Sequence, residues 1–235
     1  MTGREMQSKL MMRLCSFFNY SFVKKMNISS KSTMIRMIFL VFLSINASSQ
    51  NIDYQILKSI HLNRDVRLDP FSNIVSKSTS WISIAYPLSL GTAGLIQSDS
   101  ALFVGGISAG IGLGFSSLVS IISKQTIQRT RPFETHSEII PPFDLPNTSS
   151  FPSGHTTSAF ETATHFSLTF RKWYFVVPAY AWAGTVAWSR LQQGVHYPSD
   201  VAAGAILGGL SAWLSFKANG WIGLKTKKFR RKILR

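Results

Sequence analysis

Residues 101–132 read ALFVGGISAGIGLGFSSLVSIISKQTIQRTRP. The part from 101 to 123 carries no charged residue, which is typical of a helix that crosses a lipid bilayer. Charges follow at once, because Lys124 comes next and Arg131-Pro132 lies seven residues further on. In a helix that continued to this proline, Lys124 and Arg131 would lie on one face, two turns apart. The stretch predicts an apolar helix whose end presents two cations, and interfacial anchoring is the simpler alternative for Lys124.

The charge of the chain is concentrated at its two ends. The 235 residues carry a formal net charge of +15, although 45% of them are hydrophobic. Seven of the 25 Lys and Arg residues precede Met37 and eight follow Phe216, with long apolar segments between them. Basic ends around apolar segments indicate membrane topology rather than a nucleic-acid surface, which would carry its basic residues on a folded face. The single cysteine, Cys15, excludes an intrachain disulfide and a thiolate metal cluster.

The N-terminal region divides into three parts by composition. Residues 1–33 are polar and basic, and we interpret them as a flexible cytoplasmic extension, with Met34 or Met37 as alternative first residues. Residues 34–49 combine a basic flank, a short apolar core and a small-residue end, which predicts a cleaved signal peptide; an uncleaved anchor is the alternative. Residues 50–80 predict interfacial helices, and nothing in them suggests chemistry.

Five apolar segments form the predicted membrane domain, which covers residues 81–216 and precedes a basic cytoplasmic tail at 217–235. The segments are 81–97, 101–123, 154–170, 173–188 and 198–216. Most are close to the shortest length that spans a bilayer, so the predicted fold is an all-α, membrane-embedded bundle of five to six transmembrane helices. Glycines at every fourth position would let such helices approach closely, at Gly106, Gly110, Gly114, Gly204 and Gly208. A soluble bundle of buried helices is the alternative.

Five successive spans would place all the polar motifs on one side of the membrane. The other side would receive the turn at Asp99, the turn at 171–172 and the tail after Phe216. With the residues before Met37, that side holds 17 of the 25 Lys and Arg residues, so it is the predicted cytoplasmic side. The motifs are therefore predicted to be extracytoplasmic, in a bacterial inner membrane with the site facing the periplasm.

The tetrapeptide Pro152-Ser153-Gly154-His155 opens the third apolar segment. Serine is a preferred helix N-cap, and the glycine would let a ligand approach the backbone closely. The free amides at a helix start attract anions, so this place suits a phosphate with His155 beside it. A structural turn is the alternative reading of the tetrapeptide alone.

A second pair of motifs follows the fourth apolar segment. Arg190 ends that segment, where it could bind two phosphate oxygens or anchor the helix at the interface. His196 comes four residues before Asp200, a spacing that lets the carboxylate accept a hydrogen bond from one imidazole nitrogen. The other nitrogen is then a free lone pair, which makes His196 the candidate nucleophile and His155 the candidate acid. A purely structural His–Asp pair is the alternative.

Several other polar residues are predicted to have no catalytic role. Arg129 lies off the face of Lys124 and Arg131, and is expected to contact solvent or headgroups. Glu161 and His165 are expected to hydrogen-bond to each other inside the bundle. The remaining histidines, His61 and His136, are predicted to be exposed. The loop after Pro132, residues 133–151, is predicted to overhang the site, either as a selector of the headgroup or as a passive connector.

The ordered set of motifs resembles the type 2 phosphatidic acid phosphatase / vanadium haloperoxidase superfamily over about residues 100–215. Eleven residues match: Lys124, Arg131, Pro132, Pro152, Ser153, Gly154, His155, Ser189, Arg190, His196 and Asp200. The resemblance implies a helical bundle and metal-independent hydrolysis without a cofactor. It implies that His196 becomes phosphorylated, Asp200 orients it and His155 donates the proton. It further implies that the phosphate is held by Lys124, Arg131, Ser153, Gly154 and Arg190.

The resemblance also implies a substrate class, because members that lie in membranes usually act on lipid phosphates or diphosphates. Undecaprenyl diphosphate, lipid A, phosphatidic acid and phosphatidylglycerophosphate are the candidates. The expected partners are this substrate and membrane lipids, without nucleic acid, and no oligomeric state is assigned. The alternatives are a vanadium-dependent haloperoxidase, which uses the same groups, and a non-enzymatic protein that binds or transports lipid headgroups.

Overall fold

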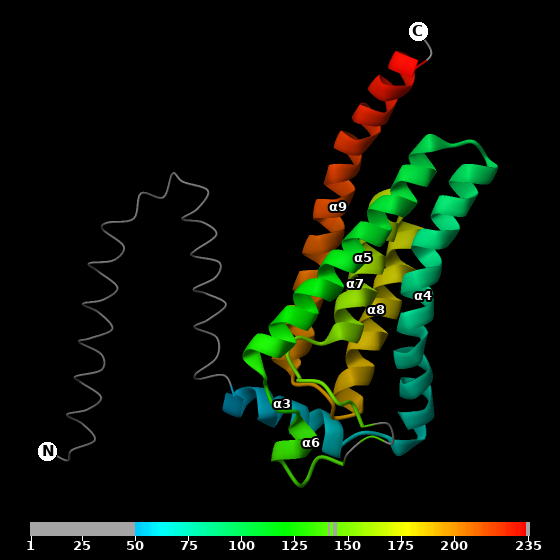
Figure 1. The fold of residues 1–235 in the computed structure, drawn as a ribbon. Coiled ribbons are helices and arrows are strands. Elements are labelled where there is room, and N and C mark those ends of the chain that lie inside the picture. Colours follow the sequence, from blue (N-terminus) through cyan, green and yellow to red (C-terminus); the bar gives the residue numbers. More distant parts are fainter. Residues whose placement is uncertain (1–49, 141, 143–144, 234–235) are drawn as a thin grey trace, which may run out of the picture. The chain divides into compact units, whose positions relative to one another are not determined.

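The computed structural model describes residues 50–140, 142 and 145–233, with the side chains of its last helix given as far as Ala218. The interpretations of 1–33 and 34–49 lie outside these residues. The regular elements in the described ranges are all helical, as predicted (Figure 1). They are α3 (Gln50–Leu62), a 3-10 turn η1 (Val66–Leu68), α4 (Asp69–Ile96), α5 (Ser100–Ile127), α6 (Pro132–Thr135), α7 (Gly154–Phe170), α8 (Trp173–Gln192) and α9 (Pro198–Ile233).

The helix ends follow from local sequence signals. Asp99 is the N-cap of α5, and its carboxylate accepts hydrogen bonds from the amides of Ala101 at 2.7 Å and Leu102 at 3.3 Å. Two helices end at a residue with left-handed backbone, Gln128 after α5 (φ 49°) and Arg171 after α7 (φ 51°). The five predicted apolar segments therefore correspond to the five long helices.

One predicted boundary is wrong, because no element begins at residue 81. Helix α4 starts at Asp69 with Pro70 in its first turn, and it runs unbroken through residue 81 to Ile96. Its first half contains Ser72, Ser76 and Thr79, which are all buried. The polar sequence suggests an interfacial helix, but these side chains face the interior of the helical bundle. The predicted interfacial region thus comprises α3 and the start of a long bundle helix.

The central helix of the bundle is α7, which packs against α4, α5, α8 and α9 (Figure 1). Its apolar core is small and consists of Ala159 and Ala163 of α7 against Ala183 and Val186 of α8. Much of the interior is instead polar, with buried Ser and Thr side chains. Those with less than 5% exposure include Ser72, Ser83, Ser108, Ser116, Thr156, Thr157, Thr162 and Ser189.

Large apolar side chains lie on the outside of the bundle. The exposed residues include Trp81, Ile84, Leu88, Ile111, Phe115, Leu118, Ile122, Val177, Ile206, Leu210 and Trp213. A polar interior with an apolar exterior is the reverse of a water-soluble bundle and suits a lipid environment. Within the described residues, two stretches are long and apolar enough to cross a membrane, Ser100–Thr135 and Pro198–Ala218. The expected count of five to six spans remains a prediction.

Close packing between helices depends on three of the five predicted glycines. A Cβ atom on Gly208 would lie 2.2 Å from the carbonyl oxygen of Thr157, and one on Gly204 would lie 2.7 Å from that of Ser153. A Cβ on Gly106 would lie 2.5 Å from the backbone nitrogen of Gly91. Glycine therefore permits the α7–α9 and α4–α5 contacts, as predicted.

The other two glycines do not mediate contacts. Among the described residues, no atom lies within 4 Å of a Cβ placed on Gly110 or Gly114, because both face outward. The regular spacing along α5 therefore does not mark a single contact face. The glycine that faces inward beside them is Gly112, which packs against Glu161 and Ser215.

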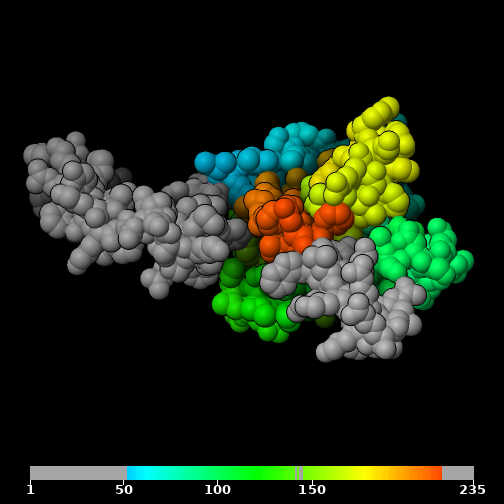
Figure 2. Space-filling model, turned by 90° about the horizontal axis from the view of Figure 1, so that it is seen from above, coloured from blue at the N-terminus to red at the C-terminus, as the bar shows by residue number. Residues whose placement is uncertain are grey.

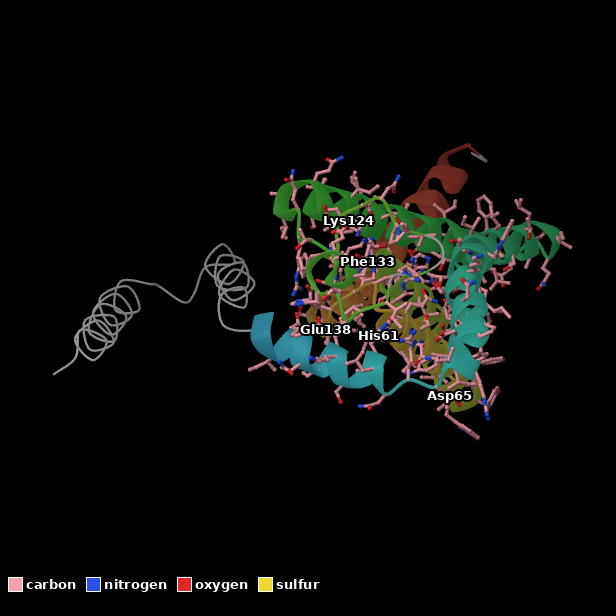
Figure 3. The ribbon with its side chains drawn as sticks, turned by 90° about the horizontal axis from the view of Figure 1, so that it is seen from below. His61, Asp65, Lys124, Phe133 and Glu138 are labelled. Carbon is pink, nitrogen blue, oxygen red and sulfur yellow. The ribbon has the colours of Figure 1, made fainter. Side chains whose placement is uncertain are left out.

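The bundle has two chemically distinct ends. At one end, α3 and α6 lie across the helix termini together with the connections that carry the predicted motifs (Figures 1 and 3). Figure 2 looks onto the other end, where the α4–α5 and α7–α8 turns and α9 reach the surface. The second of these turns carries Arg171 and Lys172, both exposed. The motifs are thus separated from this basic turn by the length of the bundle.

We predict that Gly208→Ala destabilises the protein by about 1–3 kcal/mol, because the added methyl group would overlap backbone atoms of α7 that cannot move aside. The measurement is thermal unfolding of the purified protein in detergent. Gly114→Ala is the matched control, and it should be neutral or slightly stabilising, because its methyl group enters open space. Equal melting temperatures for the two variants would contradict the glycine-mediated contact.

Candidate functional site

The predicted site residues come from five helix ends that meet at one end of the bundle (Figure 3). Lys124 lies in the last turn of α5, and Arg131 immediately precedes α6. Arg190 lies in the last turn of α8, and Asp200 lies in the first turn of α9. The tetrapeptide at 152–155 begins α7. The structure therefore brings together residues that are up to 76 positions apart in the chain.

His196 is buried between an arginine and a carboxylate. Its Nε2 atom lies 3.4 Å from a terminal nitrogen of Arg131. On the other side of the ring, Nδ1 lies 3.7 Å from Oδ2 of Asp200 and 3.4 Å from Oγ of Ser150. The expected hydrogen bond from His196 to Asp200 is therefore lengthened to a contact of 3.7 Å. The reason is that Oδ2 already accepts hydrogen bonds from the Ser150 hydroxyl (2.5 Å) and the Tyr197 amide (2.9 Å).

The environment of His196 keeps its imidazole neutral. Burial lowers the pKa of His196 to about 3, although the nearby carboxylate of Asp200 acts in the opposite direction. At neutral pH the ring then carries one proton, and the carboxylate favours that proton on Nδ1. This tautomer leaves a lone pair on Nε2, which is the nitrogen that faces Arg131. The geometry is that of an oriented imidazole nucleophile.

Three cations surround this imidazole and are held by neutral oxygen atoms. Arg131 donates to the carbonyl oxygens of Thr148 at 2.7 Å and Val195 at 2.9 Å. Lys124 donates to the carbonyl oxygen of Ser149. These two residues also repel each other electrostatically, and Arg190 repels both. Positive charge thus accumulates here without an ion pair to any carboxylate in the part of the chain that the structure describes.

The third cation, Arg190, has an unused donor. One terminal nitrogen donates to Oγ of Ser76 on α4 and, at 2.9 Å, to Oε1 of Gln193. The residue is only 7% exposed, yet its Nε atom is buried without a hydrogen-bond partner among the described residues. A buried N–H group of a guanidinium normally has an acceptor. An anion that accepts from Nε would satisfy it.

Arg129 does not contact solvent as predicted, and instead it neutralises the acidic residues of the site. Its guanidinium donates to Oδ1 of Asp200 at 2.6 Å and to Oδ2 of Asp53 at 2.7 Å, and it lies 4.0 Å from the centre of the Tyr197 ring. The prediction failed because α5 ends at Ile127, so helical spacing does not apply to residues 129 and 131. Arg131 reaches the site through the turn that follows the helix.

Asp53 of α3 joins this network from outside the predicted motifs. It is 5% exposed and accepts hydrogen bonds from the amide of Ser199 at 2.9 Å and from its hydroxyl. Ser199 lies in the first turn of α9, where amide groups lack partners within the helix. Asp53 therefore caps α9 and at the same time fixes Arg129 against Asp200. The only signal in the sequence was a single acidic residue in the amphipathic stretch that forms α3.

The start of α7 lies against the same cluster. Ser153 is its N-cap, as predicted, but its hydroxyl pairs with the hydroxyl of Thr156 at 2.9 Å, and its amide donates to the carbonyl oxygen of Asp200 at 3.0 Å. His155 follows in the first turn, where the charges of Arg190, Arg131 and Lys124 all act on it. The close approach of a ligand at Gly154 remains a prediction.

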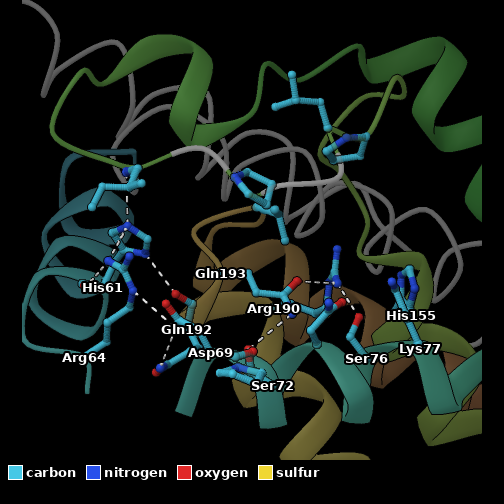
Figure 4. A pocket seen from close by; sticks show the side chains of 17 residues that line it. His61, Arg64, Asp69, Ser72, Ser76, Lys77, His155, Arg190, Gln192 and Gln193 are labelled. Carbon is cyan, nitrogen blue, oxygen red and sulfur yellow. Dashed lines mark hydrogen bonds and ion pairs between the residues drawn. The ribbon is translucent and has the colours of Figure 1, made fainter. Parts of the chain in front are cut away.

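A pocket of about 680 Å³ opens beside His155 and Arg190 (Figure 4). One wall is the polar face of α4, which includes Ser72, Ser76 and Lys77. The opposite wall is the apolar segment around Leu145 and Pro146. Sequence reasoning missed the α4 wall, because serines repeating at a spacing of four carry no functional signature on their own. The predicted overhanging loop is present, and its end at 148–150 also binds the site residues directly.

His61 is buried, contrary to the prediction, and it joins α3 to two other segments. Its Nδ1 lies 2.9 Å from the carbonyl oxygen of Gln192, and its Nε2 accepts from the amide of Ile140 at 3.1 Å. Burial lowers the pKa of His61, and the positive charge of Arg64 lowers it further. The second histidine, His136, is half-buried and stacks on Tyr54 with 3.7 Å between ring centres.

The expected hydrogen bond between Glu161 and His165 is not formed. The imidazole of His165 pairs with the hydroxyl of Tyr86 at 3.0 Å and with that of Ser108 at 3.2 Å. Oε1 of Glu161 is buried without a hydrogen-bond partner among the described residues. Both residues lie inside the bundle, as predicted, but neighbouring helices supply closer partners for the histidine than its own helix does.

Comparison with known proteins was made by sequence and by structure. The model of the PAP2 superfamily matches residues 105–223. The lipid A 4'-phosphatase of Bacteroides thetaiotaomicron is 41% identical over 66 residues, and the match covers 28% of this chain and 29% of that protein. The undecaprenyl-diphosphatase of Sulfolobus acidocaldarius is 28% identical over 192 residues, which cover 78% of this chain and 85% of that protein.

The fold is similar to that of a transmembrane PAP2-type phosphatidylglycerolphosphate phosphatase from Bacillus subtilis. The TM-score is 0.67 at 24% sequence identity, and the likeness covers 82% of this chain and 97% of that chain. This likeness and the apolar exterior confirm the predicted fold class, an all-α membrane-embedded bundle.

We predict that Asp53→Ala destabilises the protein by about 3 kcal/mol, because it leaves a largely buried Arg129 with half of its carboxylate partners. The measurement is thermal unfolding in detergent. Lys58→Ala is the matched control. It breaks the exposed ion pair with Glu138 and should leave the melting temperature almost unchanged, because solvent screens this pair. If the two variants unfold at the same temperature, the tie between α3 and Arg129 contributes nothing.

Proposed function

The chain belongs to the PAP2 superfamily, and on that premise we propose that it is an integral membrane phosphatase that hydrolyses a lipid phosphate or diphosphate through a phosphohistidine. The observation that carries the proposal is the arrangement around His196. A neutral imidazole presents Nε2 to Arg131, which forms a cationic group with Arg190 and the half-buried Lys124. The hydrogen bonds that these three side chains donate to oxygen atoms of the described residues all go to neutral acceptors. Such a site attracts a multiply charged anion, and it places the nucleophile next to the position that the phosphorus atom would occupy.

In the proposed first step, Lys124, Arg131 and Arg190 bind the phosphoryl oxygens and His196 Nε2 attacks phosphorus in line with the leaving group. The P–O bond to the lipid breaks as the N–P bond forms, and the electron pair goes to the leaving oxygen. Asp200 stabilises the positive charge that develops on the imidazole. Because Arg129 also binds Asp200, the carboxylate remains ionised and in place throughout.

His155 is the proposed proton donor to the departing oxygen. It lies in the first turn of α7 and lines the pocket together with Arg190, so a substrate bound by Arg190 would place its leaving group nearby. In the second step, the same imidazole accepts a proton from water, and the hydroxide attacks the phosphohistidine. The N–P bond then breaks, which releases inorganic phosphate and restores the lone pair on His196.

The proposed site faces the extracytoplasmic side, which is the periplasm if the protein lies in a bacterial inner membrane. The motif end and the basic turn at Arg171-Lys172 lie at opposite ends of the bundle. Basic residues favour the cytoplasmic side of a membrane. These two points support the proposal that the motif end faces outward.

We predict that His196→Ala abolishes phosphate release, by at least about a thousandfold, and also abolishes the labelled phosphoenzyme, because it removes the imidazole nitrogen that is proposed to attack phosphorus. The assay is phosphate release by the detergent-purified protein from undecaprenyl diphosphate, lipid A, phosphatidic acid and phosphatidylglycerophosphate. His136→Ala is the matched control, since this histidine stacks on Tyr54 away from the site. Substantial turnover by His196→Ala would refute the covalent mechanism, and halide oxidation after addition of vanadate would favour a haloperoxidase.

The orientation is tested separately with single cysteines in a Cys15→Ser background. We predict that Ser137→Cys, in the exposed loop after α6, reacts with a membrane-impermeant maleimide in intact spheroplasts. Lys172→Cys, in the exposed turn at the opposite end, should react only after the membrane is permeabilised. The reverse labelling pattern would place the site on the cytoplasmic side.

A further inference from the structure

The hydroxyl group of Ser150 lies between the proposed nucleophile and the carboxylate beside it. The side chain is fully buried, and its Oγ lies 2.5 Å from Oδ2 of Asp200 and 3.4 Å from Nδ1 of His196. The direct distance from that nitrogen to Oδ2 is 3.7 Å. Each step of the route through the hydroxyl group is therefore shorter than the direct contact.

The protons on this route can point in only one direction. A hydroxyl group has one proton and two lone pairs, whereas an ionised carboxylate can only accept. The proton of Ser150 therefore belongs to the 2.5 Å contact with Asp200, and a lone pair of Oγ is left to face the imidazole of His196. The ring must then carry its proton on Nδ1. Arg131 requires the same tautomer, because its N–H group faces Nε2 at 3.4 Å and cannot accept.

The carboxylate of Asp200 has no free position for a direct bond to the imidazole. Oδ2 accepts from the hydroxyl of Ser150 and, at 2.9 Å, from the amide of Tyr197. These two donors use the lone pairs of that oxygen. Oδ1 accepts from Arg129 at 2.6 Å. Because both oxygens are held from other sides, the carboxylate cannot move to close the 3.7 Å gap, and a link between the two groups needs the hydroxyl.

The backbone holds Ser150 in this position. Its amide donates to the carbonyl oxygen of Arg129 at 2.8 Å. The two residues before it, Thr148 and Ser149, bind two cations of the site through their carbonyl oxygens. One short segment thus fixes the neighbour of the nucleophile together with the groups that would bind phosphate, which is the support that an accurately oriented site requires.

We propose that Ser150 is a positioning residue that connects His196 to Asp200, through one hydrogen bond from Nδ1–H to Oγ and a second from Oγ–H to Oδ2. Its role in turnover rests on the proposed function, because the orientation of the ring matters only if Nε2 attacks phosphorus. No proton leaves the ring in that step. The electron pair of Nε2 forms the N–P bond, the ring becomes positively charged, and both hydrogen bonds strengthen. The hydroxyl therefore stabilises the transition state more than the bound substrate, and its loss should lower kcat rather than raise KM.

The first test is the kinetics of Ser150→Ala, with the lipid phosphate that the detergent-purified wild-type protein hydrolyses fastest. We expect kcat to fall about tenfold to a hundredfold, the effect of a lost hydrogen bond to a charged group, while KM stays within about twofold. Ser116→Ala is the matched control, because this equally buried hydroxyl donates to the carbonyl oxygen of Leu113 in its own helix, at 3.0 Å. The control should retain kcat within about twofold.

A double-mutant cycle shows whether Ser150 acts through the carboxylate. In an Asp200→Asn background, Ser150→Ala should lower kcat by no more than about twofold, because the group to which the hydroxyl connects the ring is already gone. A purely structural serine would lower kcat by the same factor in both backgrounds. Equal factors, or an unchanged kcat for Ser150→Ala alone, would overturn the proposal.

A second measurement needs no turnover. In protein labelled with 15N-histidine, the signal of His196 is identified by its loss in His196→Gln. The proton should lie on Nδ1 in the wild type and in Ser116→Ala, with a downfield resonance. In Ser150→Ala this resonance should move upfield, because the proton has lost its acceptor, while the other histidine signals show that the variant is folded.

The outcomes separate the positioning role from the proposed function. Phosphate release that is lost in His196→Ala but unaffected by Ser150→Ala would overturn the role of the serine and leave the phosphatase proposal intact. No phosphate release from any lipid would instead overturn the proposed function, and the histidine spectrum would then judge the hydrogen-bonded link alone. A proton on Nε2 in the wild type would overturn the link even if Ser150→Ala does not fold, and so would an unchanged Nδ1–H resonance in a folded Ser150→Ala.

Discussion

The rest of the structure depends on a group of cations that forms no ion pair with a carboxylate of the described residues. Burying a cation is costly unless it has a partner of opposite charge, and a hydrogen bond to a carbonyl oxygen replaces only part of the lost hydration. Arg131, Lys124 and Arg190 are nevertheless held by neutral oxygens of the 148–149 backbone, Val195, Ser76 and Gln193. The chain around the site follows from this need, because the segment before α7 must turn its carbonyl groups inward. A bound anion would supply the missing charge, which is why this end of the bundle suits a phosphate better than a neutral ligand.

The carboxylates of the site are kept from neutralising those cations. Asp200 lies within reach of the same cluster, but Arg129 binds one of its oxygens, while Ser150 and the Tyr197 amide bind the other. Asp53 then occupies the second side of Arg129. This arrangement gives His196 a nearby carboxylate without an ion pair between Asp200 and Arg131. The division into a compensated pair of carboxylates and an uncompensated group of cations explains why α3, which is outside the matched motifs, is part of the site.

The parts that could be predicted from the sequence are those fixed by local rules. The apolar segments predicted the long helices, because a lipid-facing helix must be apolar along its length. The motif residues were found because their types and order are distinctive. The errors arose where contacts link distant parts of the chain. Ser76 meets Arg190, Asp53 meets Arg129, and His61 meets Gln192, and no local pattern marks these pairs. Arg129 was misplaced for a related reason, because the left-handed Gln128 ends the helix on which the spacing argument relied.

The polar interior and the position of the site have a common cause. Within the bundle, Ser, Thr and Gly allow the helices to pack closely, and the large apolar side chains point outward to lipid. Close packing of this kind leaves little room between the helices for a charged headgroup, and hydrocarbon excludes one from the outer surface. Space and charge can coincide only where the helices end, and there α3, the first turns of α4 and the segment ahead of α7 enclose the pocket. A lipid substrate could then keep its chains along the apolar exterior while its phosphate enters the cationic end. The same packing that suits the helices to a membrane thus confines the proposed chemistry to its surface.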